Sequence, residues 1–266
     1  MRVGAASRVF ALLGDPVSHS LSPVMYNATF AALGIDAVYV PLRCGTDAVE
    51  ALMRTLAGQG GGGNVTIPHK TTAAEVLTRL GGYDADVCNT FWGQVDGLVG
   101  TETDSAGILA SLSRLDATAG AWCLIGTGGS ARSALRAARR AGASVAIQSR
   151  TPERANALAD AATALGVPLV EVGECHVAIN CSPLGLADGD PLPLPPAALP
   201  AARVALDLVY RRGETAWVRA MRHAGCRAAD GREMLVEQGA LAFEHWFPRQ
   251  RAPREIMRAA VGAALG

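Results

Sequence analysis

The stretch Ala121-Trp-Cys-Leu-Ile-Gly-Thr-Gly-Gly-Ser-Ala131 decides the fold that we expect for this chain. Residues 122–125 form an apolar run short enough for a buried parallel strand. Residues 130–141 then have the spacing of an amphipathic helix, which ends at Gly142. A strand, a glycine turn and a helix therefore follow one another, as they do at the start of a βαβ unit.

The glycine turn reads Gly126-x-Gly128-x-x-Ala131. In this pattern glycines let the backbone approach a pyrophosphate that lies on the N-terminus of the following helix. A chain with 30 glycines matches the pattern easily by chance, and an ordinary tight turn is the alternative. The pattern is therefore weak evidence by itself.

The next apolar run, residues 143–148, completes the βαβ unit. An acidic residue just past this strand would accept the ribose 2′-hydroxyl of NAD. The chain has Ser149-Arg150-Thr151 there, followed by Arg154, at close to the usual spacing of about 20 residues after the glycines. Arginine at this place favours a 2′-phosphate and hence NADP. The alternative is that both arginines are solvated charges at a helix end.

Length and charge narrow the class of protein. A chain of 266 residues is long enough for two ordinary domains. Its 24 basic and 24 acidic residues give no field that would hold nucleic acid or an anionic membrane, so we expect a small-molecule partner. The six cysteines are scattered and the histidines lack metal-ligand spacing, so we expect reduced thiols and no metal. The apolar run 9–13 is too short for a signal peptide, which predicts a cytoplasmic protein.

The first helix is expected to begin with Ser22 as its N-cap and Pro23 in its first turn, and to end at Gly34. Ser20 and Ser22 then lie at a positive helix end, where two hydroxyls beside backbone N–H groups suit a carboxylate. The alternative is that Ser22 simply caps the helix, which leaves Ser20 unexplained.

Lys70 is expected at the end of a strand formed by residues 64–67, just before a helix with the capping box Thr72-x-x-Glu75. A helix N-terminus repels an ammonium group, so this position is unfavourable unless a carboxylate compensates. The candidate is Asp104, before a helix over residues 105–115, although N-capping explains Asp104 equally well.

The remaining expectations are coarser. Gly60 to Gly63 is predicted to be a loop, and Asn89-Thr90 is a turn-like pair. Residues 190–200 are proline-rich and are expected to form a surface connection. We expect further strands over 8–13, 37–41, 177–180 and 204–210, and further helices over 47–56, 151–165, 216–224, 234–247 and 253–264.

The order of these motifs is specific. It begins with Gly14-x-Pro16-x-x-His19-Ser20-x-Ser22-Pro23, Asn64-Val-Thr66-x-Pro68-x-Lys70, Asn89-Thr90, Thr103-Asp104-x-x-Gly107 and Gly126-x-Gly128-Gly129. It continues with Asn180-Cys-Ser182-Pro183-x-Gly185, Asp207-x-Val209-Tyr210 and Gly231-x-x-Met234-Leu-Val-x-Gln238-Gly239. In this order, over nearly the whole chain, the sequence resembles the shikimate dehydrogenase family.

The resemblance implies an α/β fold with two domains and a site in the cleft between them. Residues 1–103 with 231–266 would form the substrate domain, and residues 104–230 a Rossmann domain that binds NADP. The activity implied is NADP-dependent interconversion of 3-dehydroshikimate and shikimate in the chorismate pathway of aromatic amino acid biosynthesis. The partner would be a cyclic carboxylate, with neither nucleic acid nor membrane, in a monomer or homodimer.

The resemblance also assigns roles to residues. Lys70 and Asp104 would be the catalytic acid–base pair. The substrate carboxylate would meet Ser20, Ser22 and Tyr210, and the ring hydroxyls would meet Asn64, Thr66, Asn89 and Gln238. NADP would meet Gly126, Gly128, Gly129, Ser130, Ala131, Ser149, Arg150, Arg154, Asn180, Ser182 and Gly231.

Several positions depart from the family pattern. Tyr26 replaces a histidine, Ser149 replaces an asparagine, Arg211-Arg212 replaces Asn-Pro, and Arg232-Glu233 interrupts a Gly-Leu-Gly-Met run. These departures leave a quinate or aminoshikimate-type dehydrogenase as an alternative. A non-catalytic NADP-binding sensor is a further alternative, because a fold alone does not prove turnover, although the presence of Lys70 and Asp104 argues against it.

Glu102 replaces the asparagine usual before Thr-Asp. If residues 100–104 are extended, Glu102 and Asp104 share a face, and Glu102 would raise the pKa of the catalytic lysine. The alternative is that Glu102 turns outward to solvent.

Overall fold

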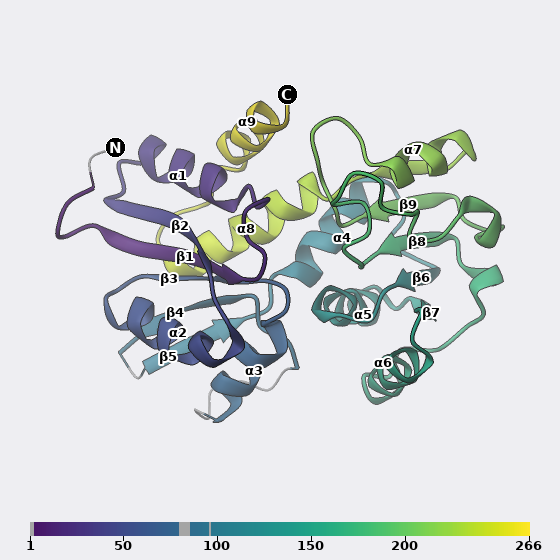
Figure 1. Ribbon diagram of the computed structural model, residues 1–266, viewed down its shortest axis with the longest axis horizontal. Helices are drawn as coiled ribbons and strands as arrows, with labels where there is room; N and C mark the ends of the chain where they lie inside the picture. The colour runs from purple at the N-terminus through teal and green to yellow at the C-terminus, as the bar shows by residue number, and fades with distance from the viewer. Residues whose placement is uncertain (1–2, 80–85, 96) are drawn as a thin grey trace. The chain divides into compact units, whose positions relative to one another are not determined.

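The computed structural model describes residues 3–79, 86–95 and 97–266 (Figure 1). The chain divides into two compact units. Unit 1 comprises Met1–Thr103 and Leu235–Ala264, and unit 2 comprises Asp104–Met234 and Leu265–Gly266. Within the described residues, no helix is long and apolar enough to cross a membrane.

The sheet of unit 1 has the strand order β2–β1–β3–β4–β5. The strands β1, β2 and β3 are parallel, whereas β4 and β5 continue the sheet in antiparallel pairing. The register places Asn64 opposite Thr90, and Thr90 opposite Thr101. These strands are β1 (Arg8–Gly14), β2 (Ala37–Arg43), β3 (Gly62–Val65), β4 (Thr90–Gln94) and β5 (Gly97–Thr101).

Helices cover both faces of the unit 1 sheet (Figure 1). On one face an aromatic cluster joins β1 to helices α1 and α8, with the rings of Phe10 and Trp246 4.7 Å apart and those of Phe10 and Phe30 5.6 Å apart. On the other face, Met53 and Leu77 pack from α2 and α3 against Leu13. The helices are α1 (Ser22–Ala32), α2 (Val49–Gly58) after the short η1 (Thr46–Ala48), α3 (Lys70–Arg79), α8 (Arg232–Trp246) and α9 (Arg254–Leu265).

The sheet of unit 2 is parallel throughout, with the order β10–β9–β8–β6–β7. This is the order of a doubly wound dinucleotide-binding fold, in which β6–α5–β7 is the first βαβ unit. The strands are β6 (Ala121–Ile125), β7 (Ser144–Gln148), β8 (Val177–Asn180), β9 (Val204–Asp207) and β10 (Arg227–Ala229). The helices are α4 (Asp104–Arg114), α5 (Gly129–Ala141), α6 (Pro152–Ala164), α7 (Ala216–His223) and the short η2 (Val172–Glu174) and η3 (Pro196–Ala198).

Alternation along β6 explains how this sheet is buried on both sides. Trp122 and Leu124 join the core formed with α4, α5 and α6, whereas Cys123 and Ile125 join the core formed with α7. A strand buried on both faces reads as a continuous apolar run. This is why the opening stretch of the sequence predicted it correctly, together with α5 and its left-handed C-cap at Gly142 (φ 66°).

The glycine run was predicted wrongly as a loop, because Gly62 and Gly63 lie in β3. A Cβ on Gly62 would lie 2.4 Å from the carbonyl oxygen of Phe91, and one on Gly63 would lie 2.1 Å from that of Ala11. The neighbouring backbones approach too closely for a side chain, so glycine is needed inside this strand. The prediction of a turn at Asn89-Thr90 was also wrong for Thr90, which pairs with Asn64 of β3 as the first residue of β4.

Two helix starts also differ from the expectation. The helix α1 begins at Ser22, its N-cap is Leu21, and no side chain caps it in the predicted way. The helix α3 begins at Lys70, so Thr72 lies inside the helix and does not form the predicted capping box. In unit 2, β9 ends at Asp207 rather than at residue 210, and the sequence analysis missed the short strand β10.

Candidate functional site

Five predicted or neighbouring polar side chains of unit 1 form one buried cluster, which we call the amide cluster: Asn64, Asn89, Thr90, Thr103 and Gln238. Each is at most 6% exposed. Asn89 Nδ2 donates to Thr103 Oγ1 at 3.0 Å and to Gln238 Oε1 at 3.3 Å. Asn64 Nδ2 donates to the carbonyl oxygen of Asn89 at 3.1 Å and to Thr90 Oγ1 at 3.0 Å. The cluster therefore joins β3 and β4 to α8.

The hydrogen bonds inside the amide cluster fix what it offers to a ligand. Both Nδ2 hydrogens of Asn64 are used, while its Oδ1 accepts from Tyr39 Oη at 2.9 Å and has a second lone pair. Gln238 uses one Nε2 hydrogen on the carbonyl oxygen of Leu235 at 2.9 Å. Asn64 is therefore set to accept, and Gln238 to donate, one further hydrogen bond. A ring hydroxyl can make either bond, because it can donate to Asn64 Oδ1 or accept from Gln238 Nε2.

The serines at the start of α1 differ from the expectation in how they cap the helix, whereas their binding of a carboxylate stays a prediction. Ser20 Oγ accepts from the backbone N–H of Ser22 at 3.2 Å, so Ser20 satisfies one of the N-terminal donors of the helix. Ser22 is the first residue of the helix and is 4% exposed. Thr66, half-buried, follows β3, and its backbone N–H donates to the carbonyl oxygen of Leu13 at 2.8 Å.

The predicted catalytic residues are both buried at helix starts. Lys70 is the first residue of α3 and is 7% exposed, and Asp104 is the first residue of α4 and is 4% exposed. A carboxylate in a first helical turn is favoured by the helix dipole, whereas an ammonium there is disfavoured. Burial of a lysine at this kind of position requires compensation, which is typical of a functional group.

The glycine turn of unit 2 has the geometry of an anion site. Gly126 has φ 110°, and a Cβ there would lie 3.1 Å from the backbone nitrogen of Ser182. At Gly128, the N-cap of α5, a Cβ would meet nothing within 4 Å, so packing of the protein does not require glycine there. No side chain caps α5 and its first turn carries no acid. The open space at Gly128 and the uncapped helix end fit a pyrophosphate.

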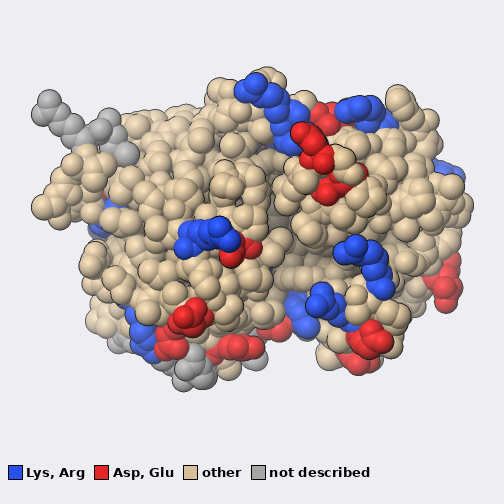
Figure 2. Space-filling model, viewed as in Figure 1, with Lys and Arg blue, Asp and Glu red and all other residues tan. Residues whose placement is uncertain are grey.

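Arg150 and Arg154 follow β7, and both are exposed. Neither forms an ion pair with any residue that the structure describes. Ser149 Oγ accepts from the backbone N–H of Thr151 at 3.2 Å and shapes the turn before α6. On the visible face, basic and acidic side chains form small mixed groups (Figure 2). This face therefore shows no broad positive patch.

Asn180 is fully buried and organises the segment after β8. Its Oδ1 accepts from the backbone N–H and the hydroxyl of Ser182, at 3.0 and 2.7 Å. Its Nδ2 donates to Asp207 Oδ1 at 2.8 Å and to the carbonyl oxygen of Leu184 at 3.0 Å. This side chain shapes the carboxyl edge of the sheet, where dinucleotides bind in this fold.

Asp207, at the end of β9, accepts further hydrogen bonds at this edge. Besides Asn180, its carboxylate accepts from the hydroxyl of Thr215 at 2.7 Å and from the backbone N–H of Val209 at 3.1 Å. Burial raises the pKa of this carboxyl to about 6, against the lowering effect of these hydrogen bonds. Gly231 lies against the same segment: a Cβ there would lie 2.3 Å from the carbonyl oxygen of Leu208. Tyr210 follows and is half-buried.

Sequence reasoning did not assign a role to Tyr39, Thr90 or Asp207. Asp207 and Thr90 stood inside quoted motifs, whereas Tyr39 stood in a predicted strand with no signal beyond its hydroxyl. The strand β5 ends at Thr101 and Asp104 begins α4, so regular strand structure does not reach Glu102 and Asp104. That these two carboxylates share a face stays a prediction.

These features define a class, the dinucleotide-dependent dehydrogenases built from two α/β units. Two family models match the chain: the shikimate dehydrogenase substrate binding domain over residues 12–90 and the shikimate 5'-dehydrogenase C-terminal domain over residues 231–261. Shikimate dehydrogenase (NADP(+)) of Methanothrix thermoacetophila is 38% identical over 97% of this chain and 98% of its own length. That of Moorella thermoacetica is 35% identical over 100% of this chain and 98% of its own length.

The structural comparison agrees. The crystal structure of shikimate 5-dehydrogenase from Thermus thermophilus in complex with NADP(H) and shikimate has a TM-score of 0.84 and 33% identity, covering 97% of this chain and 99% of that chain. A shikimate dehydrogenase in complex with NADP+ has a TM-score of 0.86 and 26% identity, covering 100% of this chain and 98% of that chain. The chain belongs to the shikimate dehydrogenase family.

Proposed function

We propose that this chain is an NADP-dependent shikimate dehydrogenase, which interconverts shikimate and 3-dehydroshikimate. The observation that carries the proposal is the amide cluster of unit 1, in which Asn64 Oδ1 and Gln238 Nε2 keep complementary bonding capacity for ring hydroxyls. The names of two relatives support the proposal: the proteins of Methanothrix thermoacetophila and Moorella thermoacetica are both named shikimate dehydrogenase (NADP(+)).

NADP fits the residues of unit 2. The N-terminus of α5 and the open space at Gly128 would hold the pyrophosphate, and Arg150 with Arg154 would hold the 2′-phosphate. Bound NADP supplies the hydride acceptor for oxidation of a ring hydroxyl to a ketone. The protein supplies orientation and charge.

The residues of unit 1 would bind and orient the substrate. Asn64, Thr66, Asn89 and Gln238 would hold the ring hydroxyls, and Ser20 and Ser22 with Tyr210 would hold the carboxylate. In oxidation, Lys70 accepts the proton of the hydroxyl that becomes a ketone; in reduction, it returns that proton. Asp104 orients the lysine and stabilises its charged form.

The test is product identification with the purified chain, shikimate and NADP+. We expect 3-dehydroshikimate and NADPH to form in equal amounts. Chromatography identifies the first product and absorbance measures the second. A chain that binds NADP+ in calorimetry but forms neither product would be a sensor rather than an enzyme. A chain that reacts with quinate or aminoshikimate but not with shikimate would belong to a paralogue of different substrate.

A further inference from the structure

Tyr210 lies in the segment that joins β9 to α7, and the backbone is held on both sides of it. We propose that Arg232 is a positioning residue for Tyr210: its guanidinium fixes the carbonyl groups that follow Tyr210 and so sets the place of the tyrosine. The inference rests on the proposed function, in which Tyr210 binds the substrate carboxylate.

The residue before Tyr210 is fixed through both of its backbone polar groups. The N–H of Val209 donates to Asp207 Oδ1 at 3.1 Å, and the carbonyl oxygen of Val209 accepts from the N–H of Gly231 at 3.2 Å. Gly231 has no room for a side chain against Leu208. The segment before Tyr210 is thereby tied to the chain just ahead of α8.

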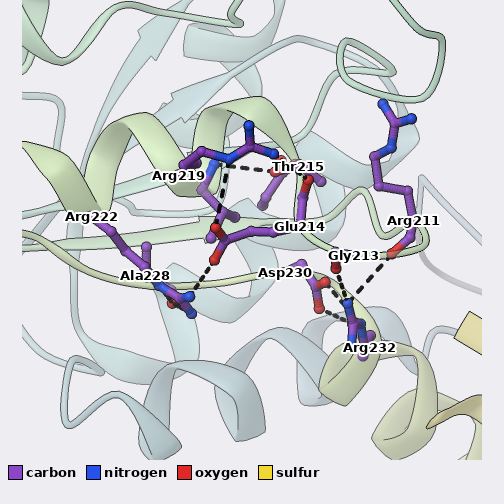
Figure 3. Close-up of polar contacts among 11 residues, drawn as sticks. Arg211, Gly213, Glu214, Thr215, Arg219, Arg222, Ala228, Asp230 and Arg232 are labelled. Atoms are coloured by element: carbon purple, nitrogen blue, oxygen red, sulfur yellow. Dashed lines mark hydrogen bonds and ion pairs between the residues drawn. The ribbon is translucent and has the colours of Figure 1, made fainter. Parts of the chain in front are cut away.

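The residues after Tyr210 are fixed by Arg232, the first residue of α8 (Figure 3). Its Nη2 donates to the carbonyl oxygen of Arg211 at 3.4 Å and to that of Gly213. Asp230 holds the guanidinium, with Nε 2.9 Å from Asp230 Oδ2, and accepts the backbone N–H of Arg232 at 3.2 Å. The Arg232 side chain therefore bridges the carbonyl groups of Arg211 and Gly213, two residues that have no other role in the proposed chemistry.

The far end of the same segment is anchored independently of Arg232 (Figure 3). Glu214 pairs with Arg222, which also donates to the carbonyl oxygen of Ala228 at 3.1 and 2.6 Å. The Thr215 hydroxyl donates to Asp207 and accepts the N–H of Val218 at 3.1 Å, which caps α7. Loss of Arg232 should therefore loosen the backbone around Tyr210 and leave α7 and the sheet in place.

A guanidinium suits this task because Nη2 has two N–H donors for the two carbonyl groups, while Nε of the same planar group faces Asp230. The tyrosine hydroxyl must have both the right position and the right orientation to bind a carboxylate. A more mobile backbone around Tyr210 is therefore expected to weaken substrate binding more than it slows the chemical step. The expected signature is a raised KM for shikimate with a smaller change in kcat.

The first measurement is amide hydrogen exchange of Arg232→Met, which keeps an apolar stem without the guanidinium. We expect faster exchange at residues 209–215 and unchanged exchange in α7. Arg219→Met is the matched control, because Arg219 pairs with Glu214 at 4.0 Å from the exposed side of the same segment. Unchanged exchange in Arg232→Met overturns the proposal whatever reaction the chain catalyses.

The second measurement is a double-mutant cycle on KM for shikimate. Arg232→Met should raise KM about tenfold, the order expected when hydrogen bonds to a charged group are lost, and Arg219→Met should leave it unchanged. In a Tyr210→Phe background, Arg232→Met should add little. Full additivity would show that Arg232 does not act through Tyr210 and would overturn the proposal. If Arg232→Met does not fold, Arg232→Lys, which keeps the charge but loses the fork, takes its place in both measurements with the same criteria.

Discussion

At the scale of single residues, cofactor choice is predicted to depend on Arg150. Replacing it by alanine should weaken binding of NADP roughly 10- to 100-fold and leave NAD nearly unchanged, because a charged hydrogen bond to the 2′-phosphate is lost. Calorimetric titration with both dinucleotides measures this. Arg139→Ala, an exposed arginine at the other end of α5, is the control. Equal weakening of NAD and NADP would remove the assignment.

The role of Lys70 is predicted to be chemical. Lys70→Ala should lower kcat by ~10²–10⁴-fold, the range typical of general acid–base groups, with nearly unchanged melting temperature. Steady-state kinetics and a thermal melt measure the two quantities. Full activity in Lys70→Ala would contradict the mechanism, and loss of folding in Asp104→Ala would indicate that Asp104 serves mainly to stabilise the first turn of α4.

Asp207 is predicted to make stability depend on pH. Burial raises the pKa of its carboxyl in the folded state to about 6, above the ordinary aspartate value of 3.8. The folded state therefore holds this proton more tightly than the unfolded state, so the stability it contributes is present below pH about 4 and is lost as the pH rises through about 6. The loss is on the order of 3 kcal/mol. Wild type and Asp207→Asn should therefore differ in the slope of unfolding free energy against pH over this window. Parallel curves in denaturant titrations would be the contrary result.

At the scale of elements, the glycines of β3 are predicted to be required by backbone contact. Gly63→Ala should lower the free energy of unfolding by about 1–3 kcal/mol, the usual cost of overpacking, because a Cβ would lie 2.1 Å from the carbonyl oxygen of Ala11. Gly262→Ala, in α9 with nothing within 4 Å of its Cβ, should instead raise it by about 0.5–1 kcal/mol. Denaturant unfolding measures the free energy of unfolding of both variants. Similar changes in the two would contradict the requirement for glycine in β3.

The same elements show what the sequence could and could not predict. The strand 122–125 and the helix after it were predicted because burial on both faces and small-residue spacing leave a local pattern. The strand predicted over residues 64–67 lies two residues earlier, as β3. Its first two residues were missed because Gly62 and Gly63 fit the carbonyl groups of Phe91 and Ala11, which are distant in the sequence. The short strand β10 carries one buried residue, Ala228, and leaves no periodicity to detect.

The candidate site was predicted by motif order rather than by local pattern. Asn64, Asn89 and Gln238 come from three distant parts of the chain, and the structure brings them into one hydrogen-bonded cluster. The hydrogen bonds of Tyr39 to Asn64 and of Arg232 to the carbonyl group of Arg211 could not be predicted, because only the folded chain brings these partners together.

At the scale of the whole molecule, unit 1 holds the amide cluster. Unit 2 holds the N-terminus of α5 and, among the residues that the structure describes, two arginines without an ion pair, Arg150 and Arg154. The central claim is that these units serve one reaction, NADP-dependent oxidation of shikimate.

The most direct test is kcat/KM for shikimate, quinate and aminoshikimate, each with NADP+ and with NAD+, in one assay series. We predict the highest value for shikimate with NADP+, with NAD+ far weaker. A preference for quinate or aminoshikimate, or for NAD+, or no turnover with any of the six pairs, would contradict the account.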